Sequence, residues 1–187
     1  MRLLDAVACA CVGLSLAACA TPDAPRPEER NLLVTLESLS EFGLALPDGY
    51  AQHEQLRRER QPDGSLSIEY EFQTPGGDPP FVYSRARIFP SPTGACLSFS
   101  ADNLGLRFSS LEATDRNDVF SYGERSRFAL VESQGQPVGN VFAMCHSRAT
   151  LLVMFVGIYF DDTESWRALV EPHLQALEAF EAATLAE

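Results

Sequence analysis

The segment ATLLVMFVGIYF, residues 149–160, constrains the fold more than any other part of this sequence. Successive side chains of a strand point to opposite faces of its sheet, and here both sets are apolar. A strand that is apolar on both sides belongs at the centre of a sheet that is covered twice. Helices can cover one face, and the other needs the N-terminal helix, a second copy or a ligand. We expect part of that second face to remain available for binding, and its members are Leu152, Met154, Val156 and Ile158.

A long helix is expected directly after this strand, over residues 161–183. Asp161 and Glu164 form a capping-box pattern at its start. Pro172 is expected to kink or split it. Apolar residues recur at helical spacing and form one stripe, which consists of Trp166, Leu169, Val170, Leu174, Leu177 and Phe180.

The rest of the chain alternates between short strand patterns and turn signals. In residues 65–74, for example, Leu66, Ile68, Tyr70 and Phe72 alternate with polar residues, which is typical of a half-buried antiparallel strand. Strands are expected at 41–51, 52–60, 65–74, 81–89, 124–133 and 140–147, and further helices at 32–39 and 91–106.

The two halves of the chain share a strand-strand-strand-helix order, which suggests a pseudo-repeat. We therefore expect an α+β fold: an antiparallel sheet of about six to seven strands, with helices packed on one face. This order, together with the segment FGLALPDGY, loosely resembles PsbP-like domains, and no residue role is carried over from that resemblance.

The N-terminus has the pattern of a signal peptide. Arg2 supplies a positive charge, and the apolar run from Ala6 to Ala18 is shorter than the roughly 20 residues that span a bilayer. Leu16-Ala17-Ala18-Cys19 resembles the lipobox of bacterial lipoproteins. That resemblance implies cleavage before Cys19 and acylation of this cysteine. An ordinary secretory signal is the alternative.

Residues after Cys19 are proline-rich and polar, which is typical of a flexible tether. We expect a signal peptide at 1–18, the lipidated cysteine and tether at 19–30, and one globular domain at 31–187. In enteric lipoproteins, an aspartate directly after the acylated cysteine resembles an inner-membrane retention signal. This position is Ala20 here, so the outer membrane, facing the periplasm, is the expected location.

Charge and composition exclude several kinds of function. A net charge of -12 disfavours nucleic acid as a partner, because phosphates would be repelled. All fourteen basic residues are arginine, so no lysine can form a Schiff base or serve a P-loop. No metal or cofactor motif is present, and no catalytic residues can be assigned from spacing.

Met144, Cys145 and His146 are the residues most similar to a soft-metal site. On a strand, however, Cys145 points away from both neighbours, so we expect structural roles for all three. A set of arginines in two neighbouring strands is expected to pair across the sheet with Glu69 and Glu71 rather than to bind an anion. That set is Arg57, Arg58, Arg60, Arg85 and Arg87.

Cys96 and Cys145 are the two cysteines that follow Cys19. Cys145 shares a strand face with Val141 and Ala143, and Cys96 lies in a segment expected to pack on that sheet. In an oxidising compartment they either form a disulfide or remain two buried thiols.

The sequence therefore predicts a periplasmic lipoprotein held to the membrane through Cys19, acting as a non-catalytic module that binds an envelope protein, with no cofactor. The alternative is an envelope hydrolase whose active site the sequence does not reveal.

Overall fold

A computed structural model describes residues 24–43, 53–108, 112–123 and 125–185. The expected strand at 41–51 lies almost wholly outside these residues, and Cys19 lies outside them too. The helices are α1 (Pro27–Arg30), α2 (Leu36–Ser40), α3 (Pro92–Phe108) and α4 (Thr163–Leu185), with a short 3-10 turn, η2, at Pro75–Gly77. The strands are β1 (Glu54–Arg60), β2 (Leu66–Gln73), β3 (Phe81–Ile88), β4 (Glu112–Asp115), β5 (Arg125–Ser133), β6 (Gln136–His146) and β7 (Ala149–Val156).

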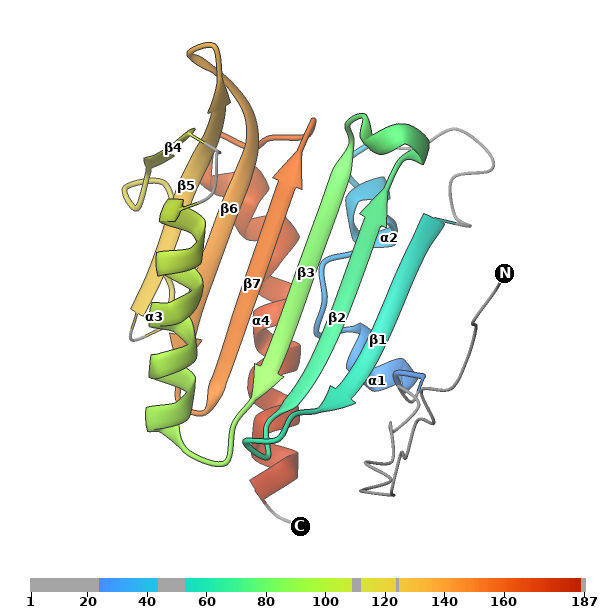
Figure 1. The fold of residues 1–187 in the computed structure, drawn as a ribbon, viewed down its shortest axis with the longest axis vertical. Coiled ribbons are helices and arrows are strands. Elements are labelled where there is room, and N and C mark those ends of the chain that lie inside the picture. The colour runs from blue at the N-terminus through green and yellow to red at the C-terminus, as the bar shows by residue number, and fades with distance from the viewer. Residues whose placement is uncertain (1–23, 44–52, 109–111, 124, 186–187) are drawn as a thin grey trace, which may run out of the picture.

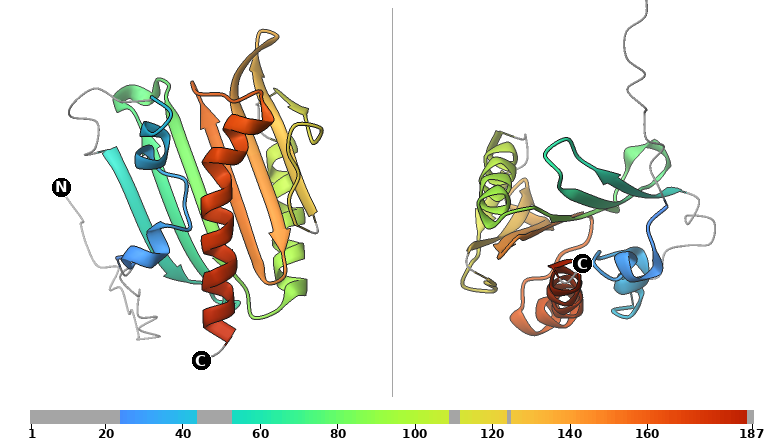
Figure 2. Two further views of the ribbon diagram at one scale, coloured as in Figure 1. Left: turned by 180° about the vertical axis from the view of Figure 1, so that it is seen from behind. Right: turned by 90° about the horizontal axis from the view of Figure 1, so that it is seen from below.

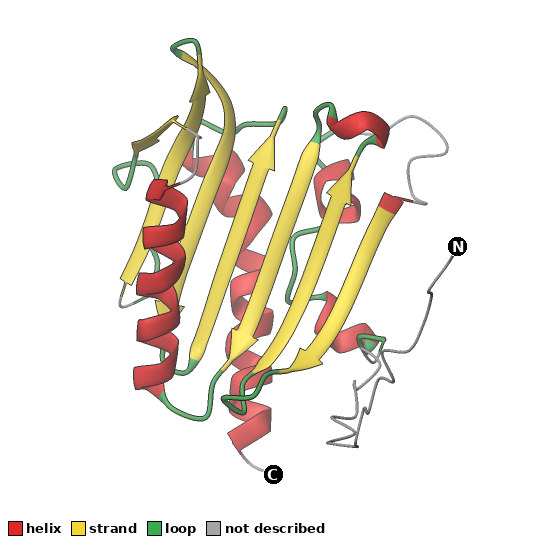
Figure 3. Cartoon of the chain, in the orientation of Figure 1, coloured by secondary structure: helices red, strands yellow, loops and turns green. Residues whose placement is uncertain are grey.

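The strands form one antiparallel sheet in the order β1-β2-β3-β7-β6-β5-β4 (Figures 1 and 3). The α+β class and the antiparallel sheet of six to seven strands are thus confirmed. Strand β7 lies at the centre, between β3 and β6, as its two apolar faces predicted. In chain order, β1-β2-β3-α3 is followed, after the short edge strand β4, by β5-β6-β7-α4.

The main core lies between one face of the sheet and α4. Trp166 is fully buried and packs against a group of aromatic rings from the sheet and the loops beside it. These rings belong to Phe120, Phe128, Phe142, Phe155 and Phe160. The predicted stripe of α4 is buried at Leu169, Val170, Leu174 and Leu177. Helix α4 continues through Pro172, and Asp162 rather than Asp161 caps it, accepting a hydrogen bond from the Ser165 N–H at 2.7 Å.

Helices cover both faces of the sheet, not one as expected. Figure 2 shows α3 on the opposite side of the sheet from α4, α1 and α2. Helix α3 packs against a buried row of β6 that consists of Val141, Ala143 and Cys145. This row lies on the opposite face of the strand from the row that faces α4. Between Pro92 and Asn103, Ala95 is buried and the other residues are partly or wholly exposed, so this part of the helix has no continuous apolar stripe that would assign it to a separate face.

The packed domain begins before Asn31, inside the segment expected to be tether. Glu29 of α1 is only 1% exposed and accepts hydrogen bonds from Nε of Arg58 at 2.9 and 3.0 Å. The following segment is held by two further bonds: Val34 N–H donates to Ser84 Oγ, and Leu36 N–H to Tyr70 Oη. A buried ion pair thus fixes residues whose composition suggested no packing.

Candidate functional site

Strands β3 and β7 carry a group of partly exposed apolar side chains on the face away from the main core. We call this group the β3–β7 strip, and it consists of Phe81, Tyr83, Leu152, Met154 and Val156. Phe81 lies opposite Val156, and Tyr83 lies opposite Met154. The residues that alternate with them along the strands, such as Val82 and Val153, point to the other face of the sheet and are fully buried in the main core. The strip therefore lies on strands whose reverse side is rigidly packed.

The structure brings together three of the four residues predicted for a binding face. Leu152, Met154 and Val156 are consecutive members of one row on β7. Ile158 does not belong with them. The strand ends at Val156, the chain turns at Gly157 with φ of 86°, and Ile158 is buried in the main core at 9% exposure. Including Ile158 in the face was therefore wrong, because strand alternation was extended beyond the end of the strand.

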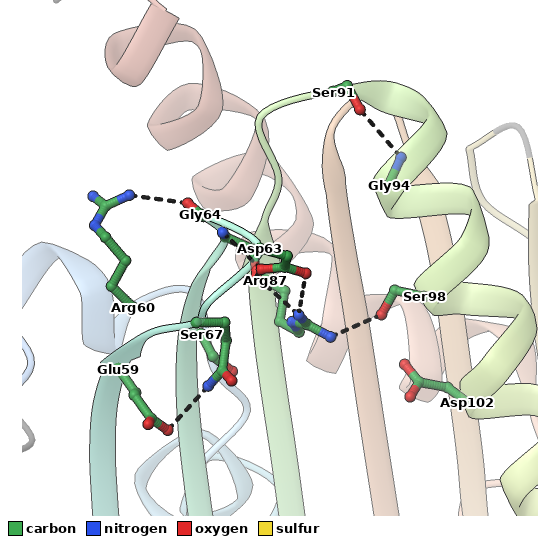
Figure 4. Close-up of polar contacts among 12 residues, drawn as sticks. Glu59, Arg60, Asp63, Gly64, Ser67, Arg87, Ser91, Gly94, Ser98 and Asp102 are labelled. Carbon is green, nitrogen blue, oxygen red and sulfur yellow. Dashed lines mark hydrogen bonds and ion pairs between the residues drawn. The ribbon is translucent and has the colours of Figure 1, made fainter. Parts of the chain in front are cut away.

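Helix α3 borders the strip on one side. Arg85, next to Tyr83 on the same face of β3, forms an ion pair with Asp102 of α3 at 2.6 Å. Arg87 donates to Ser98 of α3 at 3.1 Å and to Asp63 of the β1–β2 turn at 3.2 Å (Figure 4). The guanidinium of Arg87 also lies 4.5 Å from the centre of the Phe89 ring. These contacts hold the polar edge of the strip in place.

Several arginines that were expected to pair with Glu69 and Glu71 pair with other carboxylates in the structure. Arg58 pairs with Glu29, Arg85 with Asp102 and Arg87 with Asp63, all from other elements. Glu69 lies in register between Arg57 and Arg85, and Ser67 Oγ donates to it at 3.0 Å. The arginines have carboxylate neighbours, as expected, but most of these come from segments that sequence spacing could not bring together.

The strip is electrically neutral. Burial raises the pKa of the Tyr83 hydroxyl above its usual value, so this group is protonated at neutral pH. The remaining four members carry no ionisable group. A charged ligand therefore has no direct counter-charge within the strip itself, whereas an apolar surface would fit it.

Cys96 of α3 and Cys145 of β6 meet on the same side of the sheet, farther from the strip. Their sulfur atoms are 3.1 Å apart. They lie in a small apolar cluster with Phe89, Ala95 and Phe99. Cys145 lies on the face that strand alternation predicts, Cys96 lies in the segment expected to pack there, and the structure brings the two thiols together.

The histidines contact separate groups. His173 Nδ1 lies 2.9 Å from the carbonyl oxygen of Asn31, to which it donates. His146 Nε2 lies 3.9 Å from Oε1 of Glu178, and Tyr122 donates to the same oxygen at 2.7 Å. Burial, followed by the bond to Glu178, raises the pKa of Tyr122 to about 12, so it remains a donor. Within the described residues, no three His, Cys, Asp or Glu side chains are grouped closely enough to hold a metal ion.

One concavity in the described part of the chain has a volume of about 400 Å³ and is wide open. It lies between α3 and the β4–β5 edge, where Arg127 and Asp115 neutralise each other at 2.6 Å. Its lining is mixed, with one aromatic ring among polar and charged side chains: Phe99, Ser100, Asn103, Asp115, Asn117, Ser126 and Arg127.

Comparison with known proteins gives no relative from which a role could be transferred. No protein-family model matches the sequence, and no curated protein or solved structure matches it significantly. In the part of the chain that the structure describes, none of the helices is both long and apolar enough to cross a membrane.

Proposed function

We propose that this protein is a lipoprotein of the bacterial cell envelope, held at the periplasmic face of the outer membrane by acylated Cys19. In this proposal it acts as a non-catalytic module that binds an apolar surface of an envelope protein through the β3–β7 strip. The observation that carries the binding role is the strip itself: five neighbouring apolar side chains are partly exposed on strands whose other face is core. Such patches mark interaction sites more often than isolated apolar residues do.

The anchor is supported by the Leu16-Ala17-Ala18-Cys19 motif alone and is tested by its chemistry. Cells that express the protein are fed a labelled fatty acid. The label is expected in the parent protein and not in the Cys19→Ala variant, whose precursor should accumulate or be processed elsewhere. A parent protein without label would reduce the motif to a secretion signal.

The strip is tested by site-specific photo-crosslinking in intact envelopes. A photoreactive amino acid at Met154 is expected to give a defined adduct. The matched control is Leu97 of α3, an apolar residue that is 67% exposed and lies outside the strip. The adduct at Met154 should disappear when Leu152→Asp is added. Equal crosslinking at Leu97, or an adduct that survives Leu152→Asp, would contradict the proposal.

Folding must be checked in the same variants. Leu152 and Met154 are partly exposed, so an aspartate at either position can keep its charge in water. We expect the thermal unfolding midpoint to change little compared with Leu151→Asp, which buries a charge in the main core. If Leu152→Asp unfolds the domain as Leu151→Asp does, the strip is core.

A further inference from the structure

The first half of helix α3 meets the sheet at a small apolar cluster. Among the described residues, this cluster contains the buried residues Phe89, Ala95 and Cys145, with Cys96 and Phe99 partly buried beside them. Helix α4, in comparison, buries Trp166, Leu169, Val170, Leu174 and Leu177. Burial of apolar surface is the main source of packing energy, so a covalent bond at this small cluster would strengthen the attachment of the first half of α3.

The two cysteines lie where such an attachment would act. Cys96 is in the second turn of α3, Cys145 is in β6, and their sulfur atoms are 3.1 Å apart. A disulfide has an S–S distance of about 2 Å, so the two sulfur atoms lie about 1 Å beyond bonding distance. The two residues are 49 positions apart, so the bond would join segments that are distant in the chain.

We propose that Cys96 and Cys145 form a disulfide that fastens α3 to β6. Cys96 is partly exposed and Cys145 is fully buried, which sets the order of the reaction. The Cys96 thiolate attacks the disulfide of an oxidant, either a thiol oxidase or a small-molecule disulfide, and releases one oxidant thiol. The Cys145 thiolate then attacks the Cys96 sulfur and displaces the second oxidant thiol. The protein loses two protons and two electrons, and the oxidant disulfide is reduced to two thiols.

The bond would also define the border of the β3–β7 strip. Helix α3 covers Val141 and Ala143 of β6, which lie beside β7 on the same face as Leu152 and Met154. With α3 fastened, these two residues remain buried, and the partly exposed surface is limited to β3 and β7. Without the bond, the contacts that hold the described part of α3 to the sheet include the small apolar cluster and the contacts of Arg85 and Arg87.

Formation of the disulfide in the cell requires export to an oxidising compartment, and export is part of the proposed function. The test therefore has two arms, one in cells and one with the purified protein. In the first, envelopes are lysed with an alkylating agent, and the full-length protein is digested without reduction. A peptide pair linked through Cys96 and Cys145 is expected by mass spectrometry. In the second, the purified full-length protein is equilibrated with oxidised and reduced glutathione, which tests the pair without regard to its location.

The linked peptide is expected in both arms. Free, alkylated thiols at both residues in the second arm would overturn the inference. A bond in the second arm but not in the first would support the inference and contradict the proposed periplasmic location.

Hydrogen exchange tests the role of the bond. On reduction, amides of α3 from Ala95 to Asn103 should exchange several-fold faster, whereas amides of α4 from Trp166 to Leu177 should not change. The Cys96→Ser variant is the matched control, because α3 should exchange rapidly in it with or without reductant. Unchanged α3 exchange on reduction of a protein shown to be disulfide-bonded would contradict the fastening role.

Discussion

The carboxylate of Glu29 is buried against the sheet and accepts hydrogen bonds from Nε of Arg58 with both oxygens, at 2.9 and 3.0 Å. The Arg26 N–H donates to the same carboxylate at 2.9 Å. Glu29 is 1% exposed, whereas the Arg58 side chain is 18% exposed. This pair connects α1 to β1, the edge strand of the sheet, and so determines where the packed domain begins.

Removing Arg58 and removing Glu29 should each destabilise the domain, but by different amounts. Arg58→Ala leaves a buried carboxylate without its cation and should lower the free energy of unfolding by about 3 kcal/mol. Glu29→Ala leaves an arginine that can still reach water, so we expect a loss of about 2 kcal/mol. Urea unfolding measures both. Glu28→Ala, on the exposed side of α1, is the matched control and should change stability by less than about 0.5 kcal/mol.

The strand and helix pattern of this protein was largely predictable because it depends on local alternation. The rows of Ile68 and Phe72 in β2 and of Leu151 and Phe155 in β7 are buried as their spacing indicated. The central place of β7 followed from its two apolar faces alone. Such features need only the periods of strands and helices.

The placement of α3 and the partners of the arginines were not predictable in the same way. Between Pro92 and Asn103, helix α3 buries Ala95 fully and its other residues only in part, so no continuous stripe in this part indicated which face it covers. The pairs Arg85–Asp102 and Arg58–Glu29 join elements that only the folded topology brings together. The inclusion of Ile158 in the binding face failed because the end of a strand is determined by the turn after it, here Gly157.

Asn140 gives a second prediction about stability. Its side chain is fully buried, and both its polar atoms bond to Phe160: Phe160 N–H donates to Oδ1 at 2.7 Å, and Nδ2 donates to the carbonyl oxygen at 2.9 Å. It thus satisfies both backbone hydrogen-bonding groups of Phe160, in the connection between β7 and α4. Asn140→Ala leaves two buried backbone groups unpaired and should lower the free energy of unfolding by about 2–4 kcal/mol. Gln136→Ala, at the exposed start of the same strand, should have little effect.

His173 should make stability depend on pH in the mildly acidic range. Burial lowers its pKa from the usual 6.5, against the opposing effects of the bond to Asn31 and of Glu41. The unfolded chain therefore binds a proton at a higher pH than the folded one. Stability is unaffected above pH about 6.5 and is lost as pH falls below that value toward the folded pKa.

The variant His173→Asn separates this effect from the titration of carboxylates. Asparagine keeps an N–H donor near the Asn31 carbonyl but does not titrate. Between pH 7 and pH 5 the variant should therefore lose less unfolding free energy than the parent. An equal loss in both proteins, measured by urea unfolding at each pH, would show that His173 does not couple folding to protonation.

The docking of α1 predicts which end of the domain faces the membrane, if Cys19 is acylated as proposed. Arg26 is seven residues from Cys19, so the packed chain starts within about 25 Å of the lipid even when that stretch is fully extended. Through Glu29 and Arg58, α1 lies beside the end of β1, at the β1–β2 turn (Figure 1). The β5–β6 turn lies at the opposite end of the sheet, a distance of about 36 Å along the eleven residues of β6.

Fluorophores on two exposed turn residues test this orientation in vesicles that carry a quencher on the lipid headgroup. A label at Pro62→Cys, in the β1–β2 turn, should be quenched substantially, whereas a label at Ser133→Cys, at the end of β5, should be quenched little. Adding Cys19→Ala should abolish both signals by releasing the protein. Equal quenching of the two labels in the acylated protein would mean that the domain has no fixed orientation, and stronger quenching at Ser133 would mean that it faces the other way. No vesicle binding by the parent protein would instead contradict the anchor.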